Sequence, residues 1–82
     1  MIGQVVAVNY TRGLVAFEIE SGDFGYFEVL DMVEFEKEDK IKGNFESLGK
    51  GKIIKIDTNE IVDVFIEDYG MTYNCVINKI FE

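Results

Sequence analysis

The chain has 82 residues, 48% of them hydrophobic and 29% charged, which is enough for one domain and too little for a second core. Sixteen acidic residues against eight basic ones give a net charge of −8, which works against binding to phosphate backbones and anionic lipid. Histidine is absent and Cys75 is the single cysteine, so the commonest general base and zinc ligand is missing and no disulfide can form within the chain.

These properties also predict where the protein resides. A lone cysteine favours a reducing cytoplasm, and no apolar run is long enough to cross a bilayer. Strand-like sequence follows Met1 directly, without the basic leader of a signal peptide. We therefore expect a soluble cytoplasmic protein that does not enter a membrane.

The first 29 residues predict three consecutive strands, onto which the rest of the chain is expected to close a barrel. Apolar and β-branched residues favour strands at Ile2–Tyr10, Leu14–Glu20 and Phe24–Val29. Gly13, in the first turn, is free to take a positive φ. Gly25 lies inside the third strand, where a glycine is typical of a bulge or a sharp bend.

The next segment is strongly acidic. Six acids and a single lysine lie between Glu28 and Asp39. Alternation at Val33–Glu36 predicts a short edge strand with its acids in water, and one helical turn at Leu30–Val33 is the competing interpretation. Charge runs are usually solvated faces, which is the favoured interpretation here. If a functional surface exists outside a barrel groove, these acids could bind a divalent ion or a basic partner.

The second half again has strand-like patterns separated by turn signals. We expect strands at Lys40–Ser47, Ile53–Asp57 and Ile61–Glu67, with a flexible basic turn at Gly49–Lys52. The last segment, Thr72–Phe81, is expected to close the barrel, although its apolar residues fit a strand and one helical face equally well. Turn signals about every 8–12 residues are typical of an all-β barrel or sandwich.

The two ends of the chain resemble the cold-shock domain family. Gly3–Asn9 followed by Arg12-Gly13 is similar to that family's first strand, which ends in Asn before Lys-Gly, and Asn74–Ile80 is similar to its closing strand. The resemblance implies a five-stranded barrel of the OB type, while short Gly/Val strands leave an SH3-like topology open. We therefore predict one all-β domain over residues 1–82, a small five-stranded OB- or cold-shock-like barrel.

The resemblance also implies that the family's binding face is largely lost. Cold-shock domains stack bases on aromatic side chains of the first three strands. The family's Lys-Trp-Phe corresponds to Val6–Val8, and its Lys-Gly-Phe-Gly-Phe corresponds to Arg12–Ala16. Its Val-Phe-Val-His-Phe falls on Phe24–Glu28, which leaves Phe27 as the one candidate stacker. Because each stacked base contributes about 1–3 kcal/mol, we expect most nonspecific affinity for nucleic acid to be gone.

A diverged single-stranded nucleic-acid binder is nevertheless the alternative function. It would use Arg12, Phe27, Lys50, Lys52 and Lys55, provided that these side chains converge on one face of the barrel. A solvated hairpin turn explains the three lysines equally well, since short basic motifs are weak signals.

Three other features have ordinary structural explanations. The acids after Asp57 superficially resemble a calcium loop, but Val62 stands where the required glycine should be and Asp68 stands where glutamate should be. Cys75 is expected to be buried as a small hydrophobe, because no histidine is present to activate it. The four tyrosines could line a ligand pocket or simply pack at the barrel rim: Tyr10, Tyr26, Tyr69 and Tyr73.

Taken together, these observations favour a noncatalytic binding or protein-interaction module with an acidic surface. No nucleophile is paired with a base in the sequence, so we do not expect an enzyme, and no cofactor or metal site is predicted. The expected partner is another protein or a second copy of the chain joined through exposed strands. An acidic mimic that occupies the nucleic-acid site of a basic protein also fits the charge.

Overall fold

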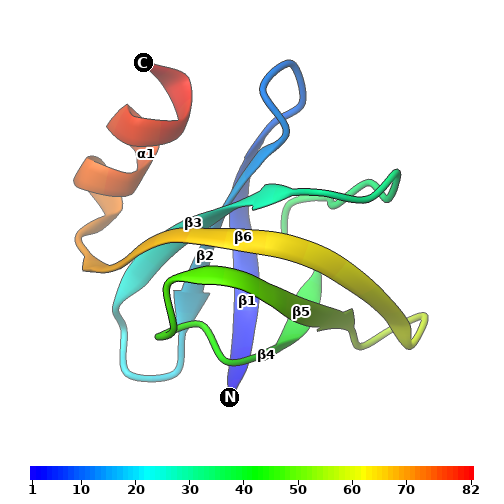
Figure 1. Cartoon of the computed structure of the whole chain (residues 1–82). Coiled ribbons are helices and arrows are strands. Elements are labelled where there is room, and N and C mark those ends of the chain that lie inside the picture. The colour runs from blue at the N-terminus through cyan, green and yellow to red at the C-terminus, as the bar shows by residue number, and fades with distance from the viewer.

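Six antiparallel strands close into a barrel, and a single helix packs against its outside (Figure 1). The computed structural model describes residues 1–82, with strands β1 (Ile2–Asn9), β2 (Leu14–Ile19), β3 (Phe24–Val29), β4 (Lys40–Gly43), β5 (Gly49–Lys55) and β6 (Glu60–Met71), followed by helix α1 (Tyr73–Phe81). The predicted all-β barrel is therefore confirmed, but it has six strands rather than five.

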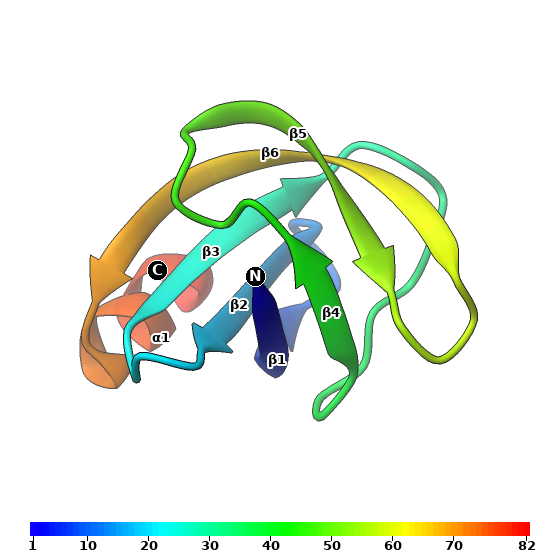
Figure 2. The ribbon, with the colours of Figure 1, turned by 90° about the horizontal axis from the view of Figure 1, so that it is seen from below.

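The barrel consists of two three-stranded meanders joined edge to edge. Its strand order is β1-β2-β3-β6-β5-β4, and β4 pairs with β1 to complete the ring seen from one end in Figure 2. The interior is filled by buried residues of all six strands together with Phe35 and Phe45 from the connections. Phe17 lies between Phe27 and Phe45, with ring centroids 5.9 and 4.7 Å away. Such aromatic pairs stabilise a small core beyond the area that they bury.

The first meander agrees closely with prediction. β3 has the predicted bounds, and β1 and β2 each end one residue early. Gly13 takes a φ of 66°, as the turn requires. At Gly25 the pairing of β3 with β6 is irregular, and a Cβ built on this glycine would lie 2.5 Å from the backbone oxygen of Asp68. The predicted bend at Gly25 is thus a close approach of two strands that only glycine allows.

The predicted basic turn at Gly49–Lys52 is wrong, because these residues form the first half of β5 and pair with β6. The turn lies earlier, at residues 44–48, where the predicted strand Lys40–Ser47 has already ended at Gly43. Phe45 lies within this turn and is fully buried, with its ring against Phe17 in the barrel core. On the other side of the hairpin, β6 continues through the predicted break at residues 68–70 and ends at Met71.

The last segment is a helix, and the expectation that it closes the barrel is also wrong. Thr72 is the N-cap of α1, and its hydroxyl accepts a hydrogen bond from the Cys75 amide at 3.2 Å. Val76 and Ile80, one helical turn apart, are both fully buried against Leu14 and Ala16 on the outside of the barrel. Cys75 faces away from this contact and is exposed, contrary to the prediction that it is buried. No helix of the protein combines the length and apolar character that crossing a membrane requires.

Candidate functional site

The acidic segment after β3 forms a loop that crosses one open end of the barrel, the mouth. Residues 30–39 are neither the predicted edge strand nor a helical turn. Two hydrogen bonds join the loop to β6 instead. The Leu30 amide donates to the backbone oxygen of Asp63, and the Asp63 amide donates to Asp31 Oδ2, each at 2.9 Å. These reciprocal bonds fix the start of the loop to β6.

Phe35 and Lys55 hold the end of the same loop. The Phe35 side chain is buried in the barrel, with its ring centroid 5.3 Å from that of Phe27 in an edge-to-face arrangement. Lys55 on β5 donates from Nζ to the backbone oxygen of Glu34 at 2.7 Å and lies 3.8 Å from Asp39 Oδ2. Its ammonium is also 5.4 Å from the centroid of the Phe35 ring, within the range of a cation–π contact. One lysine thus fastens the loop to β5 through several contacts.

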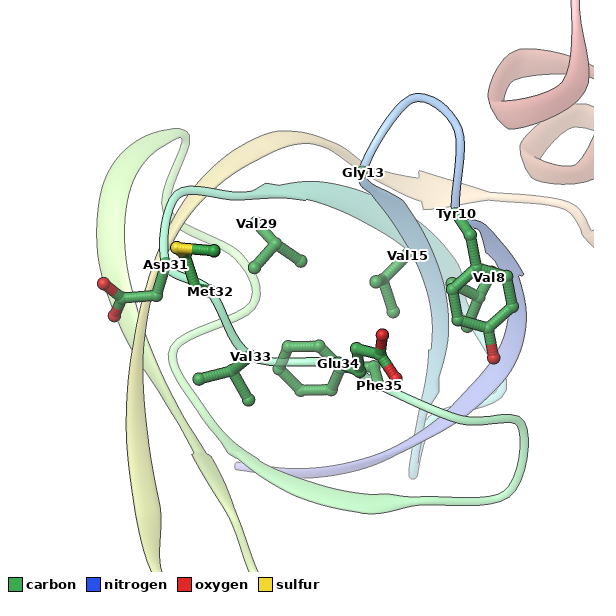
Figure 3. A pocket seen from close by; sticks show the side chains of 10 residues that line it. All are labelled: Val8, Tyr10, Gly13, Val15, Val29, Asp31, Met32, Val33, Glu34 and Phe35. Atoms are coloured by element: carbon green, nitrogen blue, oxygen red, sulfur yellow. The ribbon is translucent and has the colours of Figure 1, made fainter.

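Between this loop and the strand ends lies an apolar cavity of ≈ 300 Å³, which we call the mouth cavity. Figure 3 looks into it: Val15, Val29 and Phe35 point toward the centre, Val33 lies beside the Phe35 ring, and Tyr10 stands at one side. Met32 lies at the rim and is fully exposed. Exposed apolar side chains beside a preformed hollow are typical of binding surfaces.

The surroundings of the mouth cavity are negatively charged. Glu34, Glu36 and Glu38 are exposed on the loop, and Lys37 is its single base. Figure 3 shows the Asp31 carboxylate pointing away from the opening, in keeping with its bond to β6. Glu34 is thus the acid of the lining whose carboxylate stays free, and Glu36 and Glu38 follow it on the same exposed loop. An apolar hollow beside an acidic loop is suited to a cationic segment that carries an apolar side chain.

The five residues predicted for a nucleic-acid surface do not form one. Phe27, the proposed stacking aromatic, has no exposed area, because its ring packs in the barrel interior between Phe17 and Phe35. Arg12 donates from Nη1 to the backbone oxygen of Glu82 at 2.9 Å and so holds the end of α1. Both side chains are committed to the fold.

The three lysines lie on β5 but only one is free. Lys52 forms an exposed salt bridge with Asp63, and this hydrogen bond, with the charge of the carboxylate, raises the pKa of the Lys52 amine. Lys55 fastens the loop, and its side chain is only 16% exposed. Lys50 alone is exposed without a side-chain partner. The predicted cluster therefore offers one uncommitted positive charge.

Helix α1 covers the face on which the cold-shock resemblance would place nucleic acid. Leu14 and Ala16, which stand at positions of the family's second-strand motif, are 7% and 0% exposed beneath it. Asn9, part of the same resemblance, donates from Nδ2 to the backbone oxygen of Ile80 at 2.6 Å. Asn9 and Arg12 thus secure the helix over this face instead of presenting polar groups to a ligand.

The sequence indicated part of the mouth cavity and missed the rest. The acidic stretch and Tyr10 were both singled out, but the inward turn of Phe35 and the hollow beside Val15 and Val29 depend on tertiary packing. The full exposure of Met32 beside this hollow is the signal that the sequence could not provide.

Comparisons of the chain with protein families, curated proteins and solved structures identify no relative, so the function has to be inferred from the fold and the site geometry. No family model, no curated protein and no solved structure matches the chain. No group of three or more acidic or cysteine side chains is arranged to hold a metal ion.

Proposed function

We propose that this protein is a noncatalytic protein-interaction module, whose mouth cavity receives an apolar side chain from a positively charged segment of its partner. The observation that carries the proposal is the apolar cavity of ≈ 300 Å³, which is lined by Glu34 at the start of the exposed acidic part of the loop. A cavity of this size is at the lower end of ligand pockets and suits one or two side chains. The surrounding acids would steer a basic segment to it.

The lining supports binding rather than chemistry. It contains no serine, threonine, cysteine, lysine or histidine, and its titratable residues are Asp31, Glu34 and Tyr10. The Asp31 carboxylate is already bonded to the Asp63 amide, so Glu34 has no second free carboxylate in the lining with which to form an acid–base pair. We also propose that the barrel is related to cold-shock domains in its fold but not in its nucleic-acid-binding residues. The alternative, a diverged nucleic-acid binder, is disfavoured because α1 covers the strand face and Phe27 is buried.

The test uses labelled peptides of about ten residues, roughly 30 Å when extended, in fluorescence-anisotropy titrations. One peptide carries a central leucine flanked by lysines; in a second the leucine is serine, and in a third the lysines are glutamates. We expect binding of the first alone, with amide NMR shifts in the protein at residues 29–35. Shifts confined to β5, or equal binding of all three peptides, would contradict the proposal.

A matched pair of variants locates the site. Met32→Lys places a positive charge at the rim of the mouth cavity, and Leu48→Lys places the same charge on an exposed residue of the β4–β5 turn, outside it. We expect Met32→Lys to weaken binding about tenfold or more, equivalent to 1.4 kcal/mol, and Leu48→Lys to have little effect. Labelled single-stranded DNA serves as the competing probe; tight binding that weakens steeply with salt would favour the alternative function.

A further inference from the structure

A second apolar hollow lies outside the barrel, between β1 and α1. This groove, of ≈ 390 Å³, is lined by Val6–Val8 and Tyr10 on one side, by Tyr73, Ile77 and Phe81 on the other, and by Lys37 at one end. Tyr10, Tyr73 and Phe81 are 64%, 49% and 54% exposed. No acid lines the groove, although the chain carries sixteen acids and a net charge of −8.

The groove runs beside a strand edge that the barrel leaves unpaired. β4 pairs with β1 only over Ile2–Gln4, and residues 38 and 39 extend that pairing to Val5. From Val6 to Asn9, β1 has β2 on one side and no strand on the other. An unpaired edge presents backbone donors and acceptors that another strand can bond.

Other stretches of strand edge are also unpaired, but they carry charged residues. Gly49–Lys52 of β5 pairs with β6 alone and carries Lys50 and Lys52. β6 extends beyond its last pairing with β5, at Ile66, and there it carries Glu67 and Asp68 and bends at Gly70, where φ is +66°. Charges and local twist are the usual means of preventing a further strand from adding to an edge. Val6–Asn9 carries no charge and is flanked by exposed aromatic side chains.

We infer that a second copy of this chain occupies the groove, with the two Val6–Asn9 edges paired antiparallel about a two-fold axis. Such a pairing sets the same apolar segment against itself, as an isologous interface requires. This face lets two chains of charge −8 approach without carboxylates meeting at its centre, because no acid lines the groove. Pairing also gives the unpaired backbone groups partners and joins the two barrels through one continuous sheet.

The exposed area sets the expected strength. With about 200 Å² for each aromatic side chain, Tyr10, Tyr73 and Phe81 together expose about 300 Å² per copy, or about 600 Å² across both. The strand edge and the groove walls add to this area, and interfaces that bury less than about 1,200 Å² in total are typical of weak, transient complexes. We therefore expect a reversible dimer of low affinity.

Sedimentation equilibrium tests the inference, over protein concentrations from about 10 μM to about 1 mM, the range in which a weak dimer forms. The weight-average mass should rise from 9.4 kDa towards twice that value and stop there, because two-fold pairing consumes the edge. Raising the salt should strengthen the dimer by screening the like charges. A mass fixed at 9.4 kDa, or one that grows beyond the dimer, would overturn the inference.

Two lysine substitutions locate the interface. Phe81→Lys changes the groove and leaves the mouth cavity intact, while Ile61→Lys changes a side chain of similar exposure, 62%, on the outside of β6. Both substitutions lower the net repulsion equally. Phe81→Lys should abolish the dimer and Ile61→Lys should retain it; equal effects would refute the assignment of the face.

Hydrogen exchange in the unmodified protein provides an independent measurement, should Phe81→Lys fail to fold. The amides within Val6–Asn9 that face the groove should exchange more slowly at high protein concentration than at low. Exchange rates that do not depend on concentration would exclude the strand pairing.

Discussion

Lys52 and Lys55 lie on the same strand and each contacts a carboxylate, yet replacing them with methionine should have different consequences. Lys55 is 16% exposed, bonds the Glu34 oxygen, lies near Asp39 and faces the Phe35 ring. Lys52 is 68% exposed and contacts Asp63 alone, which is itself 50% exposed. Methionine retains most of the aliphatic stem in both positions, so the substitutions compare the ammonium groups.

The environment decides the size of each effect. A hydrogen bond from a charged donor contributes about 1.5–3 kcal/mol, and Lys55→Met also leaves Asp39, 22% exposed, without its cation. We therefore expect the free energy of unfolding to fall by about 2 kcal/mol. An exposed ion pair such as that of Lys52 contributes only about 0–1 kcal/mol, so Lys52→Met should be nearly neutral.

Urea denaturation of the two variants measures this difference, and hydrogen exchange shows where it arises. In Lys55→Met the amides of residues 34–39 should exchange faster than in the original protein, because the end of the loop has lost its attachment to β5. If Lys52→Met is as destabilising as Lys55→Met, or if Lys55→Met costs less than about 0.5 kcal/mol, the attachment assigned to Lys55 is wrong.

Three further outcomes are expected. Burial, reinforced by Glu67, raises the pKa of the Tyr26 phenol. The unfolded chain therefore ionises first, so stability that is complete below about pH 10 should decline as the pH rises through the folded-state pKa, and Tyr26→Phe should reduce this decline in alkaline urea titrations. Arg12→Ala should release the end of α1 and lower helical circular dichroism while the barrel stays folded. Gly25→Ala should cost about 1–3 kcal/mol in urea denaturation because its Cβ would meet β6 at 2.5 Å, whereas Gly51→Ala, with no atom within 4 Å, should change stability by less than about 0.5 kcal/mol.

The first meander could be predicted because its signals are local. β-Branched runs interrupted by Gly13, and the alternation that ends β2, specify strands without reference to distant residues. The second meander could not be predicted to the same accuracy, because its turn contains the buried Phe45, whose contact with Phe17 depends on a residue distant in sequence. Gly49 and Gly51 have turn-like chemistry but pair with β6 in the barrel.

For the last segment, Thr72–Phe81, hydrophobic periodicity could not distinguish a helix from a strand. Val76 and Ile80 fit one helical face, while the strand-like residues of the same stretch fit alternation, so the sequence left both states open. Tertiary packing decides between them, because Leu14 and Ala16 offer an apolar face on the outside of the barrel. The helix capped by Thr72 covers that face with Val76 and Ile80.

The same packing explains why the predicted site did not form. Arg12 and Phe27 were chosen from a resemblance in which they would face a ligand, and here they hold α1 and fill the barrel. Lys52 and Lys55 are paired within the fold. Pairing and burial depend on residues distant in sequence, so charge and residue type alone could not reveal them.

Burial and pairing within the fold limit the surfaces of this barrel that are available to a ligand or partner. The β1–β3 face is covered by α1, and the interior is filled by phenylalanines. The hollows with the most apolar linings that remain are the mouth cavity and the groove beside β1, and the two share Val8 and Tyr10. A ligand in the mouth cavity and a second copy in the groove would therefore both contact Tyr10, which is 64% exposed. If both proposals hold, occupation of one site should alter affinity at the other, and peptide titrations below and above the dimerisation midpoint would measure that coupling.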